Sequence, residues 1–293
     1  MQTFLPYADF RRSAAALDER RLGKQRVEVL QVLRALELEE YGWRNHPAVR
    51  MWQGCTPSLV AYGLACVTRW TALGHADSTA PLLREFLQRP EGIDLPAPPW
   101  LGWPALHRSH RLALYRKDPE VYGPRFPDVA GDARAGGSTL ADRAAEDASV
   151  YVWPDPPAPP RPSEPWSAWV GRPLADVGGE AVAVATAPAS ARPGTKARRT
   201  VQRFLEAVQV GDLVVEAQPL PAGCAGPGDQ RLRVGRITGA PRRRAGGAVH
   251  TRAVTWEGEL GRGELRRPAQ LQDPRPFFAL RGEPFPLLEA RGA

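Results

Sequence analysis

The chain has 293 residues with a formal net charge of +7, and 43% of its residues are hydrophobic and 24% charged. These values are typical of a soluble globular protein that is long enough for two ordinary domains. No run of about 18 apolar residues is present, so we expect no membrane span. Residues 1–12 carry charges where a signal peptide needs its apolar segment, and the three cysteines form no CxxC pair. We therefore expect a cytoplasmic protein.

The stretch from Leu17 to Trp52 has the periodicity of a helix with two faces. At about 100° per residue, Arg21, Lys24 and Gln31 fall within about 60° of Glu28, and an apolar stripe lies beside them. A single carboxylate among cations suits a polyanion site with Glu28 at its centre. The alternative is an exposed Lys24–Glu28 pair, which contributes only about 0.2–0.5 kcal/mol.

Three further helices are predicted in the first 128 residues, at 57–76, 80–89 and 104–117, because apolar residues recur at helical spacing. Strand-like alternation is absent from this part. A small, polar, irregular segment is expected at 129–148. The proline-dense stretch that follows it predicts a linker at 151–167 between a domain at 1–150 and another at 168–293.

The second domain has a different pattern. One short helix is predicted at 200–208, and β-branched runs separated by Gly/Pro turns predict strands at 211–217, 231–239, 249–258 and 277–280. Together they suggest a small, curved β-barrel, so the fold class is α + β in two domains.

The positive charge is concentrated in the second domain. Residues 192–293 hold 18 Lys/Arg and 10 Asp/Glu, whereas residues 1–191 hold 21 and 22. This asymmetry predicts a polyanionic partner for the C-terminal third.

Metal and cofactor motifs are missing. His107 and His110 stand at i,i+3, but no compact zinc spacing accompanies them. No P-loop, dinucleotide-binding glycine pattern or nucleophile elbow is present. We expect neither a metal nor an organic cofactor.

Two segments together carry a resemblance. The pattern LDERRLGKQRVEVLQVLRAL followed by GWRNHPAVRMW (42–52), and later HRSHRLALYRKDPEVYGPRF (107–126), resembles the pyrimidine-dimer DNA glycosylase family in order and spacing. This resemblance implies an all-α, endonuclease V-like domain, double-stranded DNA as partner, and a protein that acts as a monomer.

The resemblance places Glu28 at the position of the family's catalytic glutamate. It implies that the chain's N-terminal amine, here that of Met1, attacks the sugar C1′ and forms a Schiff base before β-elimination cuts the strand. An α-amine has a pKa near 7.7–8.0, against about 10.4 for lysine, so more of it is a free nucleophile at neutral pH. The large Gln2 favours retention of Met1, and Lys24 is the reserve nucleophile.

The arginine that the family places immediately before the glutamate is Val27 here, with Arg26 one step away. The side chains that we expect to contact DNA are Arg21, Arg26, Trp43, Arg44, His46, His107, His110, Arg111 and Lys117.

The second domain resembles the small PUA-like barrels, the group that contains EVE domains, which bind modified or flipped bases. The resemblance implies a modified-base pocket formed by His250, Arg252 and Trp256. It also implies phosphate contacts from Arg242, Arg243 and Arg244. The alternative for Trp256 is an ordinary place in the barrel core.

The expected function is that of a DNA glycosylase and AP lyase that excises a damaged or modified base. Two alternatives remain open. One is a non-catalytic protein that recognises modified DNA or RNA, with a role in phage defence. The other is an interaction protein whose basic barrel binds a different macromolecule, and binding insensitive to salt would favour it.

Overall fold

The computed structural model describes residues 1–87, 97–134, 166–172, 179–188, 190–192, 194–219, 226–244, 247, 249–283 and 285. The chain divides into two compact units, Met1–Pro160 and Arg161–Ala293. The predicted linker lies outside the described residues up to 165, and its last two residues already belong to the first strand of the second unit.

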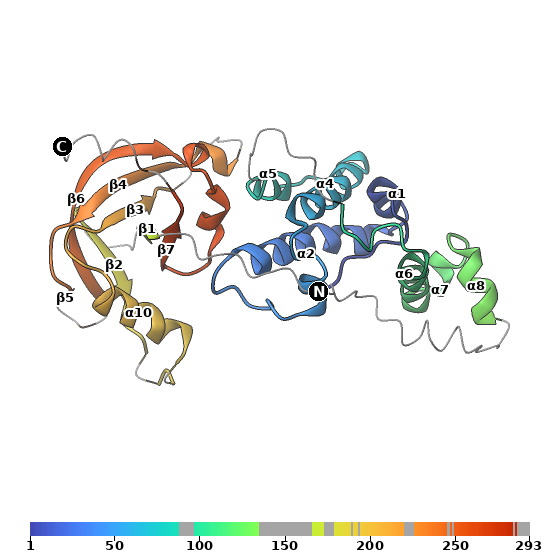
Figure 1. The fold of residues 1–293 in the computed structure, drawn as a ribbon, viewed down its shortest axis with the longest axis horizontal. Coiled ribbons are helices and arrows are strands. Elements are labelled where there is room, and N and C mark those ends of the chain that lie inside the picture. Colours follow the sequence, from blue (N-terminus) through green and yellow to red (C-terminus); the bar gives the residue numbers. More distant parts are fainter. Residues whose placement is uncertain are drawn as a thin grey trace. The chain divides into compact units, whose positions relative to one another are not determined.

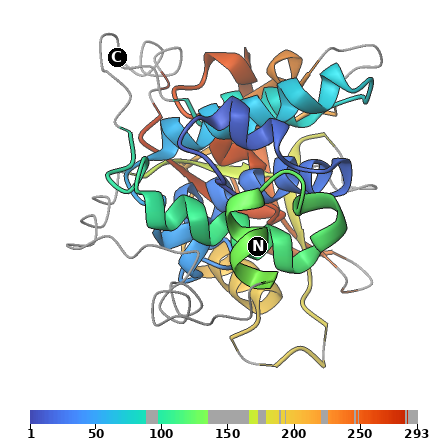
Figure 2. The same cartoon turned by 90° about the vertical axis from the view of Figure 1, so that its right-hand side faces the viewer.

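The first unit is helical throughout its described part (Figure 1). Its elements are α1 (Phe10–Ala15), α2 (Glu19–Glu37), α3 (Pro47–Arg50), α4 (Thr56–Ala72), α5 (Thr79–Arg84), α6 (Pro104–Lys117), α7 (Pro119–Tyr122) and α8 (Pro127–Arg134). Figure 2 looks onto α6, α7 and α8, drawn in green.

The predicted helix from Leu17 to Trp52 is wrong in its length. Asp18 caps α2 by accepting a hydrogen bond from the Arg21 N–H, and the helix ends at Glu37, where Leu38 turns to an extended backbone. A turn follows, in which Trp43 has a φ of +71°. Pro47 then starts the separate, short α3, because proline disfavours helical backbone in the residue before it.

The other helix predictions in this unit hold with shifted ends. The helix predicted at 104–117 has those bounds, while those predicted at 57–76 and 80–89 are shorter at their C-terminal ends. The segment predicted as irregular from residue 129 begins inside α8, and residues 135–148 lie outside the described part. Helices α1 and α7 were not predicted, since each is too short to show periodicity.

The core of the helical unit is centred on α2 and α4. The two helices approach closely at Gly63, where an added Cβ would lie 2.7 Å from Cγ1 of Val29. Trp52, Tyr62 and Leu33 are among its fully buried side chains. The close approach explains why α2 can bury its apolar stripe and still leave the Glu28 face open to the N-terminal segment.

The described part of the second unit contains a mixed, seven-stranded sheet and one α-helix. Its elements are β1 (Trp166–Gly171), β2 (Ala181–Ala185), α10 (Lys196–Glu206), β3 (Leu213–Ala217), β4 (Arg231–Ile237), β5 (Arg242–Arg243), β6 (Val249–Gly261) and β7 (Phe277–Arg281), with 3-10 helices η1 (Pro227–Asp229), η2 (Arg262–Glu264) and η3 (Pro268–Gln272). The strand order is β2-β6-β4-β3-β1-β7, with β5 on β6, and only β1 and β3 are parallel. Four of these strands were predicted. β2 escaped prediction because AVAVA is rich in alanine, which favours no strand.

Both faces of the sheet are covered. One face packs Val170, Leu232 and Phe278 against residues near η2 and η3, and the other packs Trp169 and Val254 around Phe204 of α10. The helix predicted at 200–208 is therefore α10, displaced by a few residues.

The sheet curves strongly (Figure 1). Strands β1 and β2 are not neighbours in the hydrogen-bonded order, yet a Cβ at Gly171 would lie 3.1 Å from Cγ1 of Val182. A small barrel requires such curvature. Closure and the PUA-like assignment remain predictions. Within the described residues, no helix is both long enough and apolar enough to span a bilayer.

Candidate active site at the N-terminal segment

The first residues of the chain lie against α2 in an extended segment, and the Gln25 and Glu28 side chains hold their backbone (Figure 1). The Gln2 N–H donates to Oε2 of Glu28 over 3.1 Å. Gln25, which is 1% exposed, donates from Nε2 to the Gln2 carbonyl over 2.8 Å and accepts from the Phe4 N–H over 2.9 Å. A single buried amide thus holds the backbone at both Gln2 and Phe4.

Two histidines of α6 hold Leu5 from the other side. The Leu5 N–H donates to Nδ1 of His110 over 3.0 Å, and the Leu5 carbonyl lies 2.7 Å from Nδ1 of His107. His107 Nε2 accepts from the Gly102 N–H, so the proton of a neutral ring belongs on Nδ1, where it donates to Leu5. Burial lowers the pKa of His107, which favours this neutral form.

Three more side chains complete the attachment. The Tyr62 hydroxyl donates to the Phe4 carbonyl over 2.6 Å, and Trp52 Nε1 donates to the Thr3 hydroxyl over 3.0 Å. Arg111 donates to the Pro6 carbonyl over 2.8 Å. Because buried backbone groups must be paired, this set determines where the backbone of residues 2–6 runs.

The hydrogen-bond partner of Glu28 is therefore the Gln2 N–H and not Lys24, the neighbour that an exposed helix face would provide. Lys24 is exposed, and no ion pair joins it to Glu28 in the described part of the chain. The carboxylate is directed to the chain's second residue instead. The structure thus brings together the predicted acid and the start of the chain.

His46 also lies at this site. Burial, together with the positive charge of the N-terminal ammonium, lowers the pKa of His46. Its Nδ1 accepts from the Ala48 N–H over 3.1 Å, which caps α3. The Trp43 ring stands edge-on to the imidazole with centroids 5.7 Å apart, and Trp43 is 65% exposed. Trp43 is also the one non-glycine residue with positive φ among those described, and such strain is concentrated at functional sites.

Gln2 contributes an unsatisfied donor. Its Nε2 atom is buried and has no hydrogen-bond partner among the residues that the structure describes. Buried donors without partners are rare and costly, so this amide is a donor for which the described residues supply no acceptor.

Several side chains predicted to contact DNA have other tasks in the structure. Arg26 forms an ion pair with Asp77 and stacks over Trp70 at 4.5 Å from the ring centroid, away from Glu28. Arg21 donates to Asp18 over 2.6 Å. His107 and His110 are buried beneath the N-terminal segment, and they position it. These four side chains thus have partners within the protein, and their contact with DNA remains a prediction.

The other three cations of this unit that we predicted to contact DNA are Arg111, Arg44 and Lys117. Arg111 pairs with Asp128 over 2.8 Å in addition to its bond to Pro6. Arg44 and Lys117 are exposed, Arg44 in the turn before α3 and Lys117 at the last position of α6. Their side chains keep the exposure that a phosphate contact requires, and their roles remain predictions.

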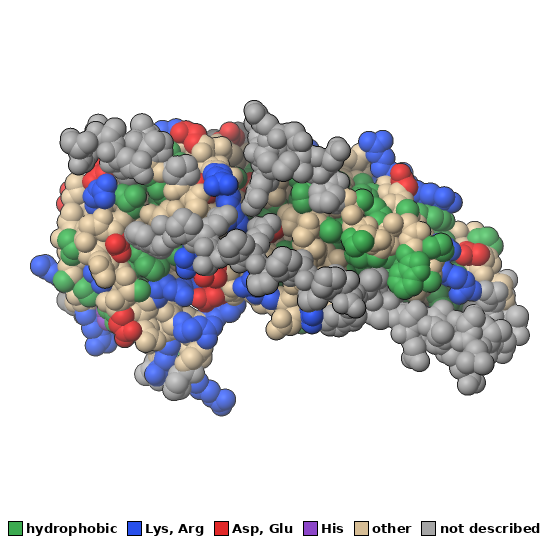
Figure 3. Space-filling view, viewed as in Figure 1, with side chains coloured by type: hydrophobic (Ala, Val, Ile, Leu, Met, Phe, Trp, Pro, Cys, Tyr) green, Lys and Arg blue, Asp and Glu red, His purple; other side chains and the backbone are tan. Residues whose placement is uncertain are grey.

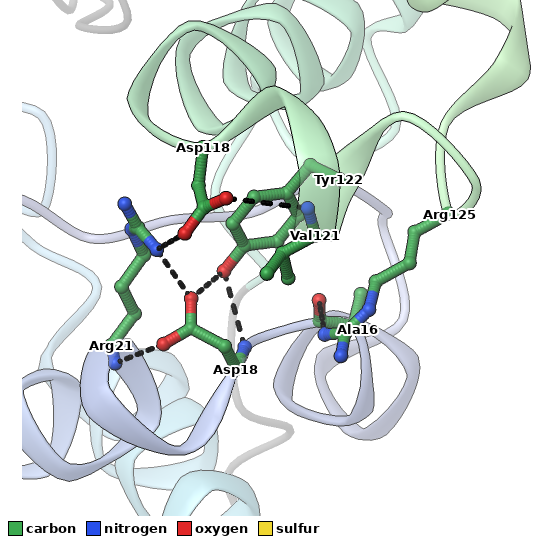
Figure 4. A network of polar contacts seen from close by, with 7 residues as sticks. All are labelled: Ala16, Asp18, Arg21, Asp118, Val121, Tyr122 and Arg125. Carbon is green, nitrogen blue, oxygen red and sulfur yellow. Dashed lines mark hydrogen bonds and ion pairs between the residues drawn. The ribbon is translucent and has the colours of Figure 1, made fainter.

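Arg21 belongs to a network that joins α2 to α7 (Figure 4). The Tyr122 hydroxyl donates to Asp18, the Asp18 N–H donates back to that hydroxyl over 3.1 Å, and Asp118 lies 3.7 Å from Arg21. Burial opposes ionisation of Asp18, but the hydrogen bonds from Tyr122 and Arg21 outweigh it and lower the pKa of the carboxyl. Burial raises the pKa of Tyr122 to about 12.

The lowered pKa of Asp18 makes stability depend on pH. Its contribution is complete above the ordinary pKa of about 3.9 and is lost as the pH falls through the lower, folded-state value. Replacing Tyr122 by Phe should cost about 2 kcal/mol of unfolding free energy at pH 7, as for a hydrogen bond to a charged group, and less at pH 3. Urea unfolding at the two pH values measures this.

Tyr7 supplies the matched control, because its hydroxyl makes no hydrogen bond with the described residues while its ring packs on Phe126. Tyr7→Phe should change the unfolding free energy by less than about 0.5 kcal/mol at either pH. Equal costs for the two variants would contradict a stabilising Asp18–Tyr122 bond.

One of the three residues predicted to form the base pocket of the second unit, Arg252, has another role in the structure. Arg252 is 3% exposed and donates to the carbonyls of Phe204 and Leu205 over 3.0 Å each, and also to that of Gly239. It caps the C-terminal end of α10, where unpaired carbonyls and the helix dipole favour a cation. Arg252 is therefore a structural residue and not part of an open pocket.

Trp256 and His250 lie on the same strand, β6. Arg233 stacks over the Trp256 ring at 4.3 Å, and the indole N–H donates to Gly179, so the ring is engaged by protein on at least two sides. His250 is half-buried and pairs with Val184 and Arg243 across the sheet. Arg242, Arg243 and Arg244 are exposed. The two predictions for this region, base pocket and phosphate contacts, remain predictions.

Among the described residues, no group of three or more His, Cys, Asp or Glu side chains is arranged to hold a metal ion. Sequence reasoning missed Gln25 and Tyr62, the two residues that hold the backbone around Phe4. Gln25 carried a signal, since it is a polar residue placed among the buried positions of α2.

The comparison with known proteins bears on this site alone. No curated protein matches the chain, and no solved structure matches it. The resemblance of residues 107–126 to the family's terminal segment lies outside the matched region and remains a prediction. Residues 1–80, which carry Glu28, Gln25 and the N-terminal segment, match the family model of the pyrimidine dimer DNA glycosylases.

Proposed function

We propose that the protein is a DNA glycosylase with AP lyase activity, in which the amine of Met1 is the nucleophile and Glu28 assists it. The observation that carries this proposal is the hydrogen bond from the Gln2 N–H to Glu28, which holds the carboxylate beside the start of the chain. A family match over residues 1–80 supports the substrate class, a damaged base such as a pyrimidine dimer in DNA.

The chemistry requires an unprotonated amine. The Met1 nitrogen attacks C1′ of the damaged nucleotide, the bond between C1′ and the base breaks, and the base leaves with the bonding electrons and takes up a proton. Loss of a proton from nitrogen and opening of the sugar give a protonated Schiff base. Removal of a proton from C2′ then expels the 3′ phosphate, and water finally releases the amine. Each positively charged stage lies beside Glu28, which stabilises it.

Neighbouring groups suit this role. His46 lies close enough to the ammonium for its charge, together with burial, to lower the pKa of the imidazole and favour the neutral ring. The exposed Trp43 offers a ring on which an extruded base stacks, and the buried Gln2 amide offers a donor to a base carbonyl or sugar oxygen.

Borohydride trapping on abasic-site DNA tests the reaction. The protein with a free N-terminus should form a covalent adduct, because borohydride reduces the Schiff base to a stable amine. Protein whose N-terminal amine has been acetylated should give none. An adduct that persists after acetylation and disappears in Lys24→Gln would assign the nucleophile to Lys24, and no adduct in any form would refute the lyase proposal.

The second unit, taken as a domain from about residue 168 with a linker at 151–167, is proposed to be a PUA-like reader of nucleic acid. Exposed Arg242, Arg243 and Arg244 beside the half-buried His250 support this role. A reader role for the second unit also supports a second candidate function. In this function both units bind modified DNA or RNA without cutting it. That candidate predicts tight binding to a modified duplex together with no strand cleavage.

A further inference from the structure

Helix α10 presents a stripe of positive charge away from the sheet. It contains four Lys/Arg residues and one Glu in 11 residues. At about 100° per residue, Lys196, Arg199 and Arg203 fall within about 60° of one another. The side of the helix that packs on the sheet carries Phe204, which is fully buried, with Val201 and Leu205 beside it. The sheet therefore fixes which side of α10 faces solvent.

The first turn of α10 is an unfavourable place for the cations that it carries. The first turn contains no acidic residue, and Lys196 and Arg199 lie at the end of the helix where the dipole disfavours cations. Glu206 is at the opposite end and accepts a hydrogen bond from Gln202. Like charges three and four residues apart destabilise a helix further. The sequence of α10 thus lowers the helix's own stability, and an external anion would reverse that effect.

Further cations extend the stripe at both ends. Arg192 is exposed just before the helix. Arg243 pairs with His250 in the sheet and lies on the same side as Arg252, whose guanidinium contacts the last turn of α10. Figure 3 shows Lys and Arg side chains gathered over α10. The nearest carboxylate of the following loop, Asp212, is engaged by Trp169 and by the Gln209 N–H.

We propose that this surface, defined by Arg192, Lys196, Arg199, Arg203 and Arg243, binds the phosphate backbone of duplex DNA. An 11-residue helix is about 16 Å long, which lets cations spaced along it contact more than one phosphate of a strand. The inference rests on the proposed function only for the choice of DNA as the polyanion.

The double variant K196E/R199E tests it on undamaged duplex DNA, so that the result does not depend on catalysis. Affinity should fall at least tenfold near 50 mM salt, and the slope of log K against log salt should become shallower by about 2, as expected for two lost phosphate contacts. The melting temperature should stay equal or rise, because carboxylates suit the first turn of a helix. Loss of affinity without loss of stability is the signature of a binding surface.

The control is R231E/R236E in the same unit, which changes the net charge equally. Arg231 and Arg236 already pair with Glu259 and Glu257, so they are expected to contribute little to DNA binding. Equal weakening by both double variants, or weakening by neither, overturns the proposal. If the protein traps no abasic DNA, the proposed lyase activity fails, but the comparison of the two affinities still decides whether α10 binds the backbone.

Discussion

Glu28→Gln should reduce strand cleavage at an abasic site by a factor of about 10²–10⁴, the range that a positioned acid–base group contributes. A glutamine still accepts the hydrogen bond from the Gln2 N–H, so the N-terminal segment should remain in place. What is lost is the negative charge beside the developing Schiff base. Single-turnover cleavage measures the effect on the chemical step separately from binding.

Lys24→Gln is the control for this variant, because it removes a charge from the same face of α2 one turn away. It should leave the single-turnover rate within about threefold, since Lys24 is exposed and makes no ion pair with Glu28. Cleavage by Glu28→Gln at close to the unmodified rate would remove Glu28 from the mechanism, whatever the result at Lys24.

Gln25→Leu should damage both stability and turnover. Gln25 is buried, and its loss leaves the Gln2 carbonyl and the Phe4 N–H without their partners. Each unsatisfied buried group costs about 1–3 kcal/mol, so for two groups we expect a loss of about 2–6 kcal/mol in the free energy of unfolding. Turnover should fall at least tenfold at saturating DNA, because a small displacement of the amine removes the reactive geometry.

Gln31→Leu makes the same chemical change further along α2, at a residue that forms no hydrogen bond with the described part of the chain. It should alter the unfolding free energy by less than about 0.5 kcal/mol and leave turnover unchanged. A Gln25→Leu protein that is less stable yet turns over normally would show that the amide supports folding without positioning the amine.

Much of the helical unit was predictable because its signals are local. The bounds of α6 follow from Pro104 at its start and Asp118-Pro119 after its end, and the core stripe of α2 follows from spacing alone. The helical spacing of α2 marks Glu28 as a lone carboxylate among cations, although this spacing by itself favoured a surface pair with Lys24. The basic character of the second unit is also a property of the sequence.

Only the tertiary structure decided which polar residues lie together. His107 and His110 are 102 and 105 residues from Leu5 in the chain, and Tyr62 is 58 residues from Phe4. No periodicity predicts such contacts, because they arise where α2, α4 and α6 each reach the N-terminal segment and pair its buried backbone groups. The tertiary structure also decided the partners of Arg26 and Arg252. Arg26 forms an ion pair with Asp77, and Arg252 donates to the carbonyls at the end of α10.

By itself, then, the sequence determined the helical periodicities, the acid at position 28 and the place of the positive charge, which depend on neighbours along the chain. The tertiary structure decided that the chain's second residue donates to that acid, and that buried amide and imidazole groups hold the segment there. The physical reason is that a short extended segment has no hydrogen-bond partners of its own, so distant helices must supply them.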